Sequence, residues 1–258
     1  MIAQARNLIG RWYSIPLLLV MWQAAVASGL VQSRLLPGVG AVWDVLVNET
    51  ANGALLYHAG VTVSRALTGF SLAAIIGIPF AAAMARSILV RNLFEPIFFV
   101  GYPVPKIALF PIFIYLFGIG SLSKVLLVFL ECLYPIAITT QAGGRAVNRA
   151  LVWSAANMGA ARARIIWSVV VPATAPFAFA GFRVAMPIAM IVVIITEMIS
   201  SADGLGYLVM YSLASFKTDR MLAIVIVIAL VGVALDRLVV GLRNRLVFWD
   251  RLESYYAE

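Results

Sequence analysis

Long runs of apolar residues are the feature that most constrains this sequence. Residues 12–31 and 66–85 contain no charged side chain, and a helix needs about 20 mostly apolar residues to cross the hydrocarbon core of a bilayer. The alternation of apolar and polar residues that marks the strands of a membrane barrel is absent. We therefore predict an all-α integral membrane protein, with residues 1–258 forming a single transmembrane domain.

The overall composition excludes a soluble protein. Apolar residues make up 63% of the chain and charged residues only 12%, whereas soluble domains carry roughly 25% charged residues. The mean hydropathy is +1.00. The net charge of +8 does not indicate a nucleic-acid partner, because most arginines lie in short segments between the apolar runs. No metal site is expected, since Cys132 is the only cysteine and His58 the only histidine.

About six membrane-spanning helices are predicted. They cover approximately residues 12–31, 62–85, 95–117, 123–141, 175–197 and 221–240. The third span contains Pro103, Pro105 and Pro111, and proline interrupts helical hydrogen bonding, so this span is expected to be bent or broken.

The distribution of positive charge predicts that both termini are cytoplasmic, because cytoplasmic loops carry an excess of Lys and Arg. In that orientation the outer segments hold only Arg34, Lys124, Lys217 and Arg220. The inner segments then hold Arg6, Arg11, Arg86, Arg91, Arg145, Arg149, Arg162, Arg164, Arg243, Arg245 and Arg251.

The inner loop at 142–174 is too polar to span a membrane and too apolar to be a free linker. Leu151, Ala155 and Met158 share one face of a short helix, and Gly159 is suited to a left-handed backbone conformation. Such a helix fits a groove on a partner protein. A helix lying on lipid headgroups is the alternative, and the residues alone leave both open.

Two charges are expected to pair inside the membrane. Lys106 lies about 16 Å from the inner end of the third span, and Glu131 about 12 Å from the outer end of the fourth, at 1.5 Å per residue. Both positions are near mid-depth on antiparallel neighbours, so we predict an ion pair at or beside a solute route. A purely structural pair, or two side chains that reach separately toward water, is the alternative.

Small residues recur every four positions in the second span, at Gly69, Ala73, Gly77 and Ala81. This spacing predicts a face on which another helix approaches closely. His58 is expected to be a solvated residue of an outer loop that extends from Gln32 to Val61, and Cys132 a small buried apolar residue.

The order of several motifs resembles one known family. Ser154-Ala155-Ala156, then Gly159-Ala160 and a later Val171-Pro172, resemble the cytoplasmic Glu-Ala-Ala loop of permease subunits in bacterial ATP-binding-cassette (ABC) importers. Other matching segments are Leu36-Pro37-Gly38, the segment 62–69, Gly77-Ile78-Pro79, 102–106, 117–120 and 204–207. Together they cover nearly the whole chain and resemble the nitrate, sulfonate and taurine branch of the type I importers.

The resemblance implies a non-catalytic permease in the bacterial inner membrane. Two copies would associate with two ATPase subunits, which bind ATP and Mg²⁺, and an extracytoplasmic binding protein would deliver a small anion, a sulfonate or a vitamin precursor. This chain has no G-x-x-x-x-G-K-[ST] phosphate loop of its own,. It departs from the family at Ser154, where glutamate is usual, and we expect this serine to cap the short helix.

Two other functional classes compete with an importer subunit. A secondary transporter or channel would work without ATP, and many such folds contain internal inverted repeats, which the sequence does not show. A membrane-embedded enzyme needs a constellation of catalytic side chains, and a single histidine outside the predicted spans does not supply one.

Overall fold

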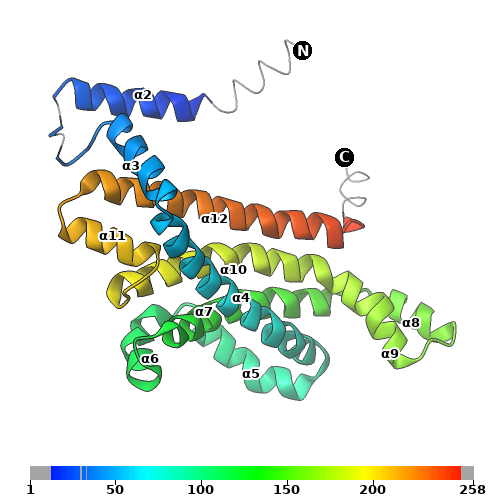
Figure 1. Cartoon of the computed structure of the whole chain (residues 1–258). Coiled ribbons are helices and arrows are strands. Elements are labelled where there is room, and N and C mark those ends of the chain that lie inside the picture. The colour runs from blue at the N-terminus through cyan, green and yellow to red at the C-terminus, as the bar shows by residue number, and fades with distance from the viewer. Residues whose placement is uncertain (1–12, 30, 33, 251–258) are drawn as a thin grey trace, which may run out of the picture.

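The computed structural model describes residues 13–29, 31–32 and 34–250, and every regular element in these ranges is a helix (Figure 1). The α-helices are α2 (Ser14–Ala27), α3 (Val39–Ala51), α4 (Ala54–Arg86), α5 (Ile88–Gly101), α6 (Phe110–Phe117), α7 (Ser121–Ala146), α8 (Arg149–Asn157), α9 (Arg162–Ile165), α10 (Val171–Ile199), α11 (Leu205–Ala214) and α12 (Thr218–Leu246). A 3₁₀ turn, Lys106–Leu109, precedes α6, and a π-helical segment, Ile166–Val170, joins α9 to α10.

Three long helices form the centre of the molecule. Helix α7 packs along both α4 and α10, and their contact surfaces are lined with small and medium apolar residues. The fully buried members include Ala73, Val128, Cys132, Ile136 and Ala185. Small side chains let the three backbones approach closely, which is how helices associate when lipid removes the hydrophobic drive for their packing.

The remaining helices flank this centre and define its two ends. Helices α3 and α11 lie at the end where α10 stops and α12 begins, which we call the α11 end (Figure 1). Helices α8 and α9 project beyond the opposite end, which we call the α8 end. A second small core at the α11 end consists of Leu55, Leu205, Leu208 and Ile224.

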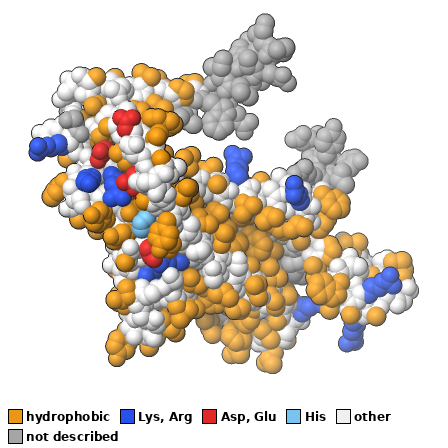
Figure 2. Space-filling model, viewed as in Figure 1, with side chains coloured by type: hydrophobic (Ala, Val, Ile, Leu, Met, Phe, Trp, Pro, Cys, Tyr) orange, Lys and Arg blue, Asp and Glu red, His pale blue; other side chains and the backbone are white. Residues whose placement is uncertain are grey.

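Four helical segments are long and apolar enough to cross a membrane, or five when the bent pair formed by α5 and α6 counts as one span. The four are 54–86, 121–146, 162–199 and 218–246. The outer face is correspondingly apolar (Figure 2), with Ile75 and Leu230 exposed by more than 60%. Apolar exposure on this scale suits lipid contact.

The expectation of about six spans is therefore corrected to four or five among the described residues. The predicted first span, 12–31, corresponds to α2, which is shorter than a membrane-spanning helix. Trp12 and Leu30, within that predicted span, lie outside the described residues.

The predicted break in the third span is confirmed. Helices α5 and α6 are bent by 91° across residues 102–105. Pro103 and Pro105 lie in the break, where their missing N–H groups prevent continuation of the helix. Pro111 lies instead in the first turn of α6, where proline is well tolerated.

The helices extend beyond the predicted spans. Helix α4 begins at Ala54 after Gly53, which has a φ of +78°, so the predicted outer loop up to Val61 is too long. His58 is consequently a half-buried residue of α4 and not a loop residue, which corrects our expectation. The predicted loop 142–174 is also mostly helical, because α7 continues to Ala146 and one continuous helical segment starts at Arg162.

Candidate functional site

Helix α8 ends in a hydrogen-bonding pattern that involves the residues of the predicted motif. The N–H of Ala160 donates to the carbonyl of Ala155 (3.1 Å), and the N–H of Gly159 donates to the carbonyl of Ala156 (2.9 Å). Gly159 has a φ of +80°. These bonds form a Schellman cap, in which the residue just past the helix takes a left-handed conformation, and its N–H and the next one pair with carbonyls of the last turn. The expected left-handed glycine is confirmed.

Ser154 does not cap this helix, which corrects our expectation. Helix α8 starts at Arg149, and the side chain of Asn148 accepts a hydrogen bond from the N–H of Ala150 (2.9 Å). Asparagine is among the best residues at this position. Ser154 lies in the second half of α8 with its side chain exposed, so no glutamate-like charge is present on this part of the surface.

The projecting loop exposes large apolar side chains. Leu151 is 54% exposed, Trp153 64% and Met158 78%. A shallow hollow of about 320 Å³ lies between α8 and the start of the long helix, lined by Leu151, Ser154, Ala155, Met158, Ser168 and Val169. The tip thus combines a rigid end, an apolar surface and surrounding arginines (Figure 2).

The four small residues of α4 lie on one buried face, and two of them can be placed against α7. A Cβ atom added at Gly69 would lie 2.7 Å from Cβ of Val128, and one added at Gly77 would lie 3.1 Å from Cδ1 of Leu133. Ala73 and Ala81 are fully buried. The close approach therefore joins α4 to α7 within one chain.

Lys106 and Glu131 are in contact, with Nζ and Oε2 3.4 Å apart. The same Nζ lies 3.2 Å from the carbonyl oxygens of both Tyr102 and Val104 and 4.3 Å from the centre of the Tyr134 ring. Lysine has three N–H donors, so each has an acceptor inside the protein. The carbonyls of Tyr102 and Val104 lie at the break between α5 and α6, and the ammonium of Lys106 donates to both.

We expect Lys106→Met to destabilise the protein more than Glu131→Gln does, by about 2 kcal/mol against less than about 1 kcal/mol. The methionine strands two carbonyls and a carboxylate, whereas the glutamine leaves Lys106 with its carbonyls and the aromatic ring. Thermal unfolding of the purified protein in detergent measures both. The charge exchange Lys106→Glu with Glu131→Lys should not restore stability, because the new carboxylate would face two carbonyl oxygens. Equal costs for the two single variants, or recovery in the exchanged protein, would contradict this assignment.

A second buried charge cluster lies at the α11 end. Arg65 in α4 is 5% exposed and Glu197 in α10 is 1% exposed, and their side chains pair at 2.8 Å. The guanidinium also pairs with Asp203, and its Nε donates to the hydroxyl of Ser121 in α7 (3.0 Å). Arg65 thereby joins three helices and the turn before α11.

The same cluster holds the first turn of α11, whose N–H groups have no partner within the helix. His58 Nδ1 accepts from the N–H of Gly204 (3.0 Å), Thr62 Oγ1 from that of Leu205 (2.8 Å), and Glu197 Oε2 from that of Gly206 (3.1 Å). Positions 58, 62 and 65 lie on one face of α4 at helical spacing. Arg65 falls within the predicted second span, but this cluster was not predicted from the sequence.

Asp203, in the turn before α11, remains ionised over the ordinary pH range. Burial disfavours its charged form, but the hydrogen bond and charge of Arg65, together with the hydroxyl of Ser201, hold the pKa of this carboxyl below its ordinary value,. Its contribution to stability is therefore present above the unfolded pKa of about 3.9 and is lost only as the pH falls through the lower folded value.

Comparison with known proteins gives a consistent result. Residues 54–247 match the model of the binding-protein-dependent transport system inner membrane component family. The chain is 29% identical to the taurine transport system permease protein of Escherichia coli, over 92% of this chain and 88% of that protein. It is 25% identical to the nitrate import permease protein of Leptolyngbya laminosa, over 89% and 84%.

A solved structure shares the fold. A chain from the inward-facing MetNI methionine ABC transporter superposes with a TM-score of 0.58 and 17% identity, over 75% of this chain and 98% of that chain. The likeness in sequence and in fold agrees with the family resemblance read from the motifs.

Proposed function

The chain belongs to the family of binding-protein-dependent transport system inner membrane components, and from this premise we propose that it is the permease subunit of an ATP-driven importer of a small anion. The observation that carries the proposal is the α8 end, where a capped helix with an exposed apolar surface projects from the helical bundle. A secondary transporter or channel has no need of such a projection.

The α8 end faces the cytoplasm in this proposal. On the visible face its projecting tip carries basic side chains, whereas acidic ones gather toward the α11 end (Figure 2). An excess of Lys and Arg is the usual mark of cytoplasmic segments. Both termini would then be cytoplasmic, and the α11 end would face the extracytoplasmic binding protein.

Helix α8 would dock on an ATPase subunit, which binds ATP and Mg²⁺. Leu151, Trp153 and Met158 supply apolar area for a groove on that partner,. Ala155, Ala156 and Gly159 would fix the angle at which the chain leaves the docked helix, through the Schellman cap. The exposed hydroxyl of Ser154 offers hydrogen bonding without charge, so docking at this position would be independent of salt.

Two copies of the chain would enclose the solute route, with one ATPase bound to each. A single copy exposes broad apolar faces on α5 and α6, where Leu93, Val100, Tyr115 and Leu116 are more than 60% exposed. The relatives named for taurine and nitrate suggest a small oxyanion as the solute, either a sulfonate or an inorganic anion; a vitamin precursor is the other class that the family branch offers.

The test compares two substitutions at Gly159, one that disfavours its left-handed backbone conformation and one that tolerates it. Gly159→Val should reduce binding-protein-stimulated ATP hydrolysis and solute uptake by several fold, because a β-branched residue resists a positive φ at a cost of about 1–2 kcal/mol. Gly159→Asn is the matched control, since asparagine adopts this conformation readily. No side chain or backbone atom lies within 4 Å of the added Cβ, so steric contact does not confuse the comparison.

Both activities are measured in liposomes that contain the chain, its ATPase and its binding protein. Equal coupling in the valine and asparagine variants would overturn the role of α8. Uptake by the purified chain alone, without any ATPase, would overturn the importer itself. Native mass measurement of the complex gives the stoichiometry, and a single permease copy with two ATPase chains would refute the dimer.

A further inference from the structure

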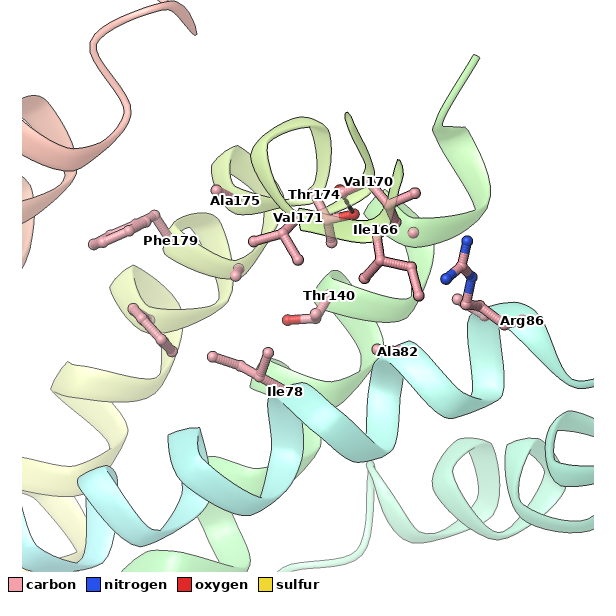
Figure 3. Close-up of a pocket in the computed structure, with 14 residues that line it drawn as sticks. Ile78, Ala82, Arg86, Thr140, Ile166, Val170, Val171, Thr174, Ala175 and Phe179 are labelled. Carbon is pink, nitrogen blue, oxygen red and sulfur yellow. Dashed lines mark hydrogen bonds between the residues drawn. The ribbon is translucent and has the colours of Figure 1, made fainter. Parts of the chain in front are cut away.

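A cavity of about 230 Å³ lies between the ends of α4 and α7 and the start of the long helix that leads into α10 (Figure 3). Its wall is almost wholly apolar, with Ile78, Ala82, Val171, Phe179 and Phe182 among the lining residues. Ala82 is exposed, so the cavity opens to the surface. A small oxyanion needs convergent polar groups to replace its water, so this wall does not suit the proposed solute.

Two polar groups on the lining lack partners among the described residues. Arg86, the last residue of α4, is exposed and forms no hydrogen bond or ion pair there. Thr140 is only 1% exposed, and its buried hydroxyl has no hydrogen-bond partner. The hydroxyl of Thr174, by contrast, donates to the carbonyl of Val170 (2.8 Å). A buried hydroxyl without a partner is uncommon and needs an explanation.

The backbone of the wall is also irregular. Ile166 and Val170 belong to the π-helical segment between α9 and α10. Such segments are rare and occur frequently at functional sites. An occupant of the cavity would therefore touch the segment that joins the projecting loop to the transmembrane part of α10.

We propose that this cavity binds an anionic amphiphile, with its acyl chain against the apolar wall and its acidic head group at Arg86. The hydroxyl of Thr140 would donate to an oxygen near the head of the chain, such as an ester carbonyl. Basic pockets between membrane helices on the cytoplasmic side are suited to anionic lipid head groups, and a hydrocarbon tail needs no hydrogen bonds from the wall. A membrane phospholipid and a free fatty acid share this chemistry.

Native mass spectrometry of the detergent-purified chain tests the proposal with three probes. Phosphatidylglycerol has an anionic head group, phosphatidylcholine has a head group with no net charge, and oleate is an anionic free fatty acid. We expect phosphatidylglycerol or oleate to bind at least fivefold more tightly than phosphatidylcholine. Arg86→Gln should weaken the binding of that anionic ligand by about fivefold, which is the contribution of one basic residue to affinity at a membrane surface. The preferred probe identifies the source as phospholipid or fatty acid.

Two further variants separate this site from general lipid adhesion. Arg245→Gln removes an exposed arginine from the last turn of α12, at the same end of the bundle, and should leave binding unchanged. Ala82→Trp should abolish binding by filling the cavity. If the tryptophan variant does not fold, the milder Ala82→Leu takes its place and should weaken binding. Equal binding of all three probes, or equal effects of the two arginine variants, would overturn the proposal. So would unchanged binding in both Ala82 variants, or a structure of the assembled transporter with protein side chains filling the cavity.

Discussion

Glu197→Ala is expected to lower the free energy of unfolding by about 3–5 kcal/mol, the cost of removing one partner from a buried ion pair. Arg65 would keep its charge in a site that is 5% exposed, with only the partly exposed Asp203 left as an ion-pair partner. The N–H of Gly206 would lose its acceptor as well, and the hydroxyl of Thr62 would be left with the carbonyl of His58 (3.2 Å) alone. A loss of this size is a large part of the total stability of a typical domain, about 5–15 kcal/mol.

Thermal unfolding of the detergent-purified protein measures this loss, and two comparisons identify its cause. Glu197→Gln should cost less, because an amide oxygen still accepts from Thr62 or Gly206. Asp250→Asn removes a carboxylate that pairs with Arg243 in the last turn of α12, where the arginine is 42% exposed, and should cost less than about 1 kcal/mol.

A double-mutant cycle gives the decisive result for this cluster. Arg65→Met combined with Glu197→Leu should be less damaging than the sum of the two single changes, because neither side of the buried pair keeps an uncompensated charge. Asp203 loses Arg65 in the single and in the double variant alike, and its side chain is 34% exposed. Strict additivity would show that the two side chains do not depend on each other. A loss for Glu197→Ala no larger than that for Asp250→Asn would contradict the buried pairing itself.

The sequence predicted the transmembrane helices better than their ends. A hydropathy run reports the length that lies in hydrocarbon, whereas a helix continues until its backbone is capped or broken. Helix α4 accordingly begins at Ala54, directly after the left-handed Gly53 and well before the apolar run, and α12 continues to Leu246. The break after α5 was predictable because proline acts locally, through its own missing N–H.

The two charge clusters differ in how much the sequence reveals. Lys106 and Glu131 were predicted to pair because each is an isolated charge in an apolar run on neighbouring antiparallel spans. The acidic partners of Arg65 come from residues more than 130 positions away, in α10 and the following turn. One signal was present, since Arg65 and Glu197 both lie near the predicted outer ends of their spans. Ser154 was misjudged as a cap because the true start of α8, at Arg149, was not recognised.

Gly69→Leu is expected to destabilise the protein by about 3 kcal/mol or more, whereas Gly60→Leu in the same helix should be neutral or stabilising. A Cβ at Gly69 would lie 2.7 Å from Cβ of Val128 and 2.8 Å from the carbonyl oxygen of Val125, whereas one at Gly60 meets nothing within 4 Å. Neither a Cβ atom nor a backbone carbonyl can move without shifting α7, so the cost is that of overpacking.

The comparison between the two glycines isolates packing from helix propensity, because both lie inside α4 and both replacements gain roughly 0.8–1.0 kcal/mol of intrinsic propensity over glycine. Alanine at the same two positions provides a milder pair. We expect Gly69→Ala to destabilise the protein and Gly60→Ala to stabilise it. Thermal unfolding in detergent measures all four variants. If leucine at position 69 is tolerated as well as leucine at position 60, then α4 and α7 are not in close contact. The small residues at 69, 73, 77 and 81 would then serve contact with a second copy of the chain, which the stoichiometry of the Gly69 variant would reveal.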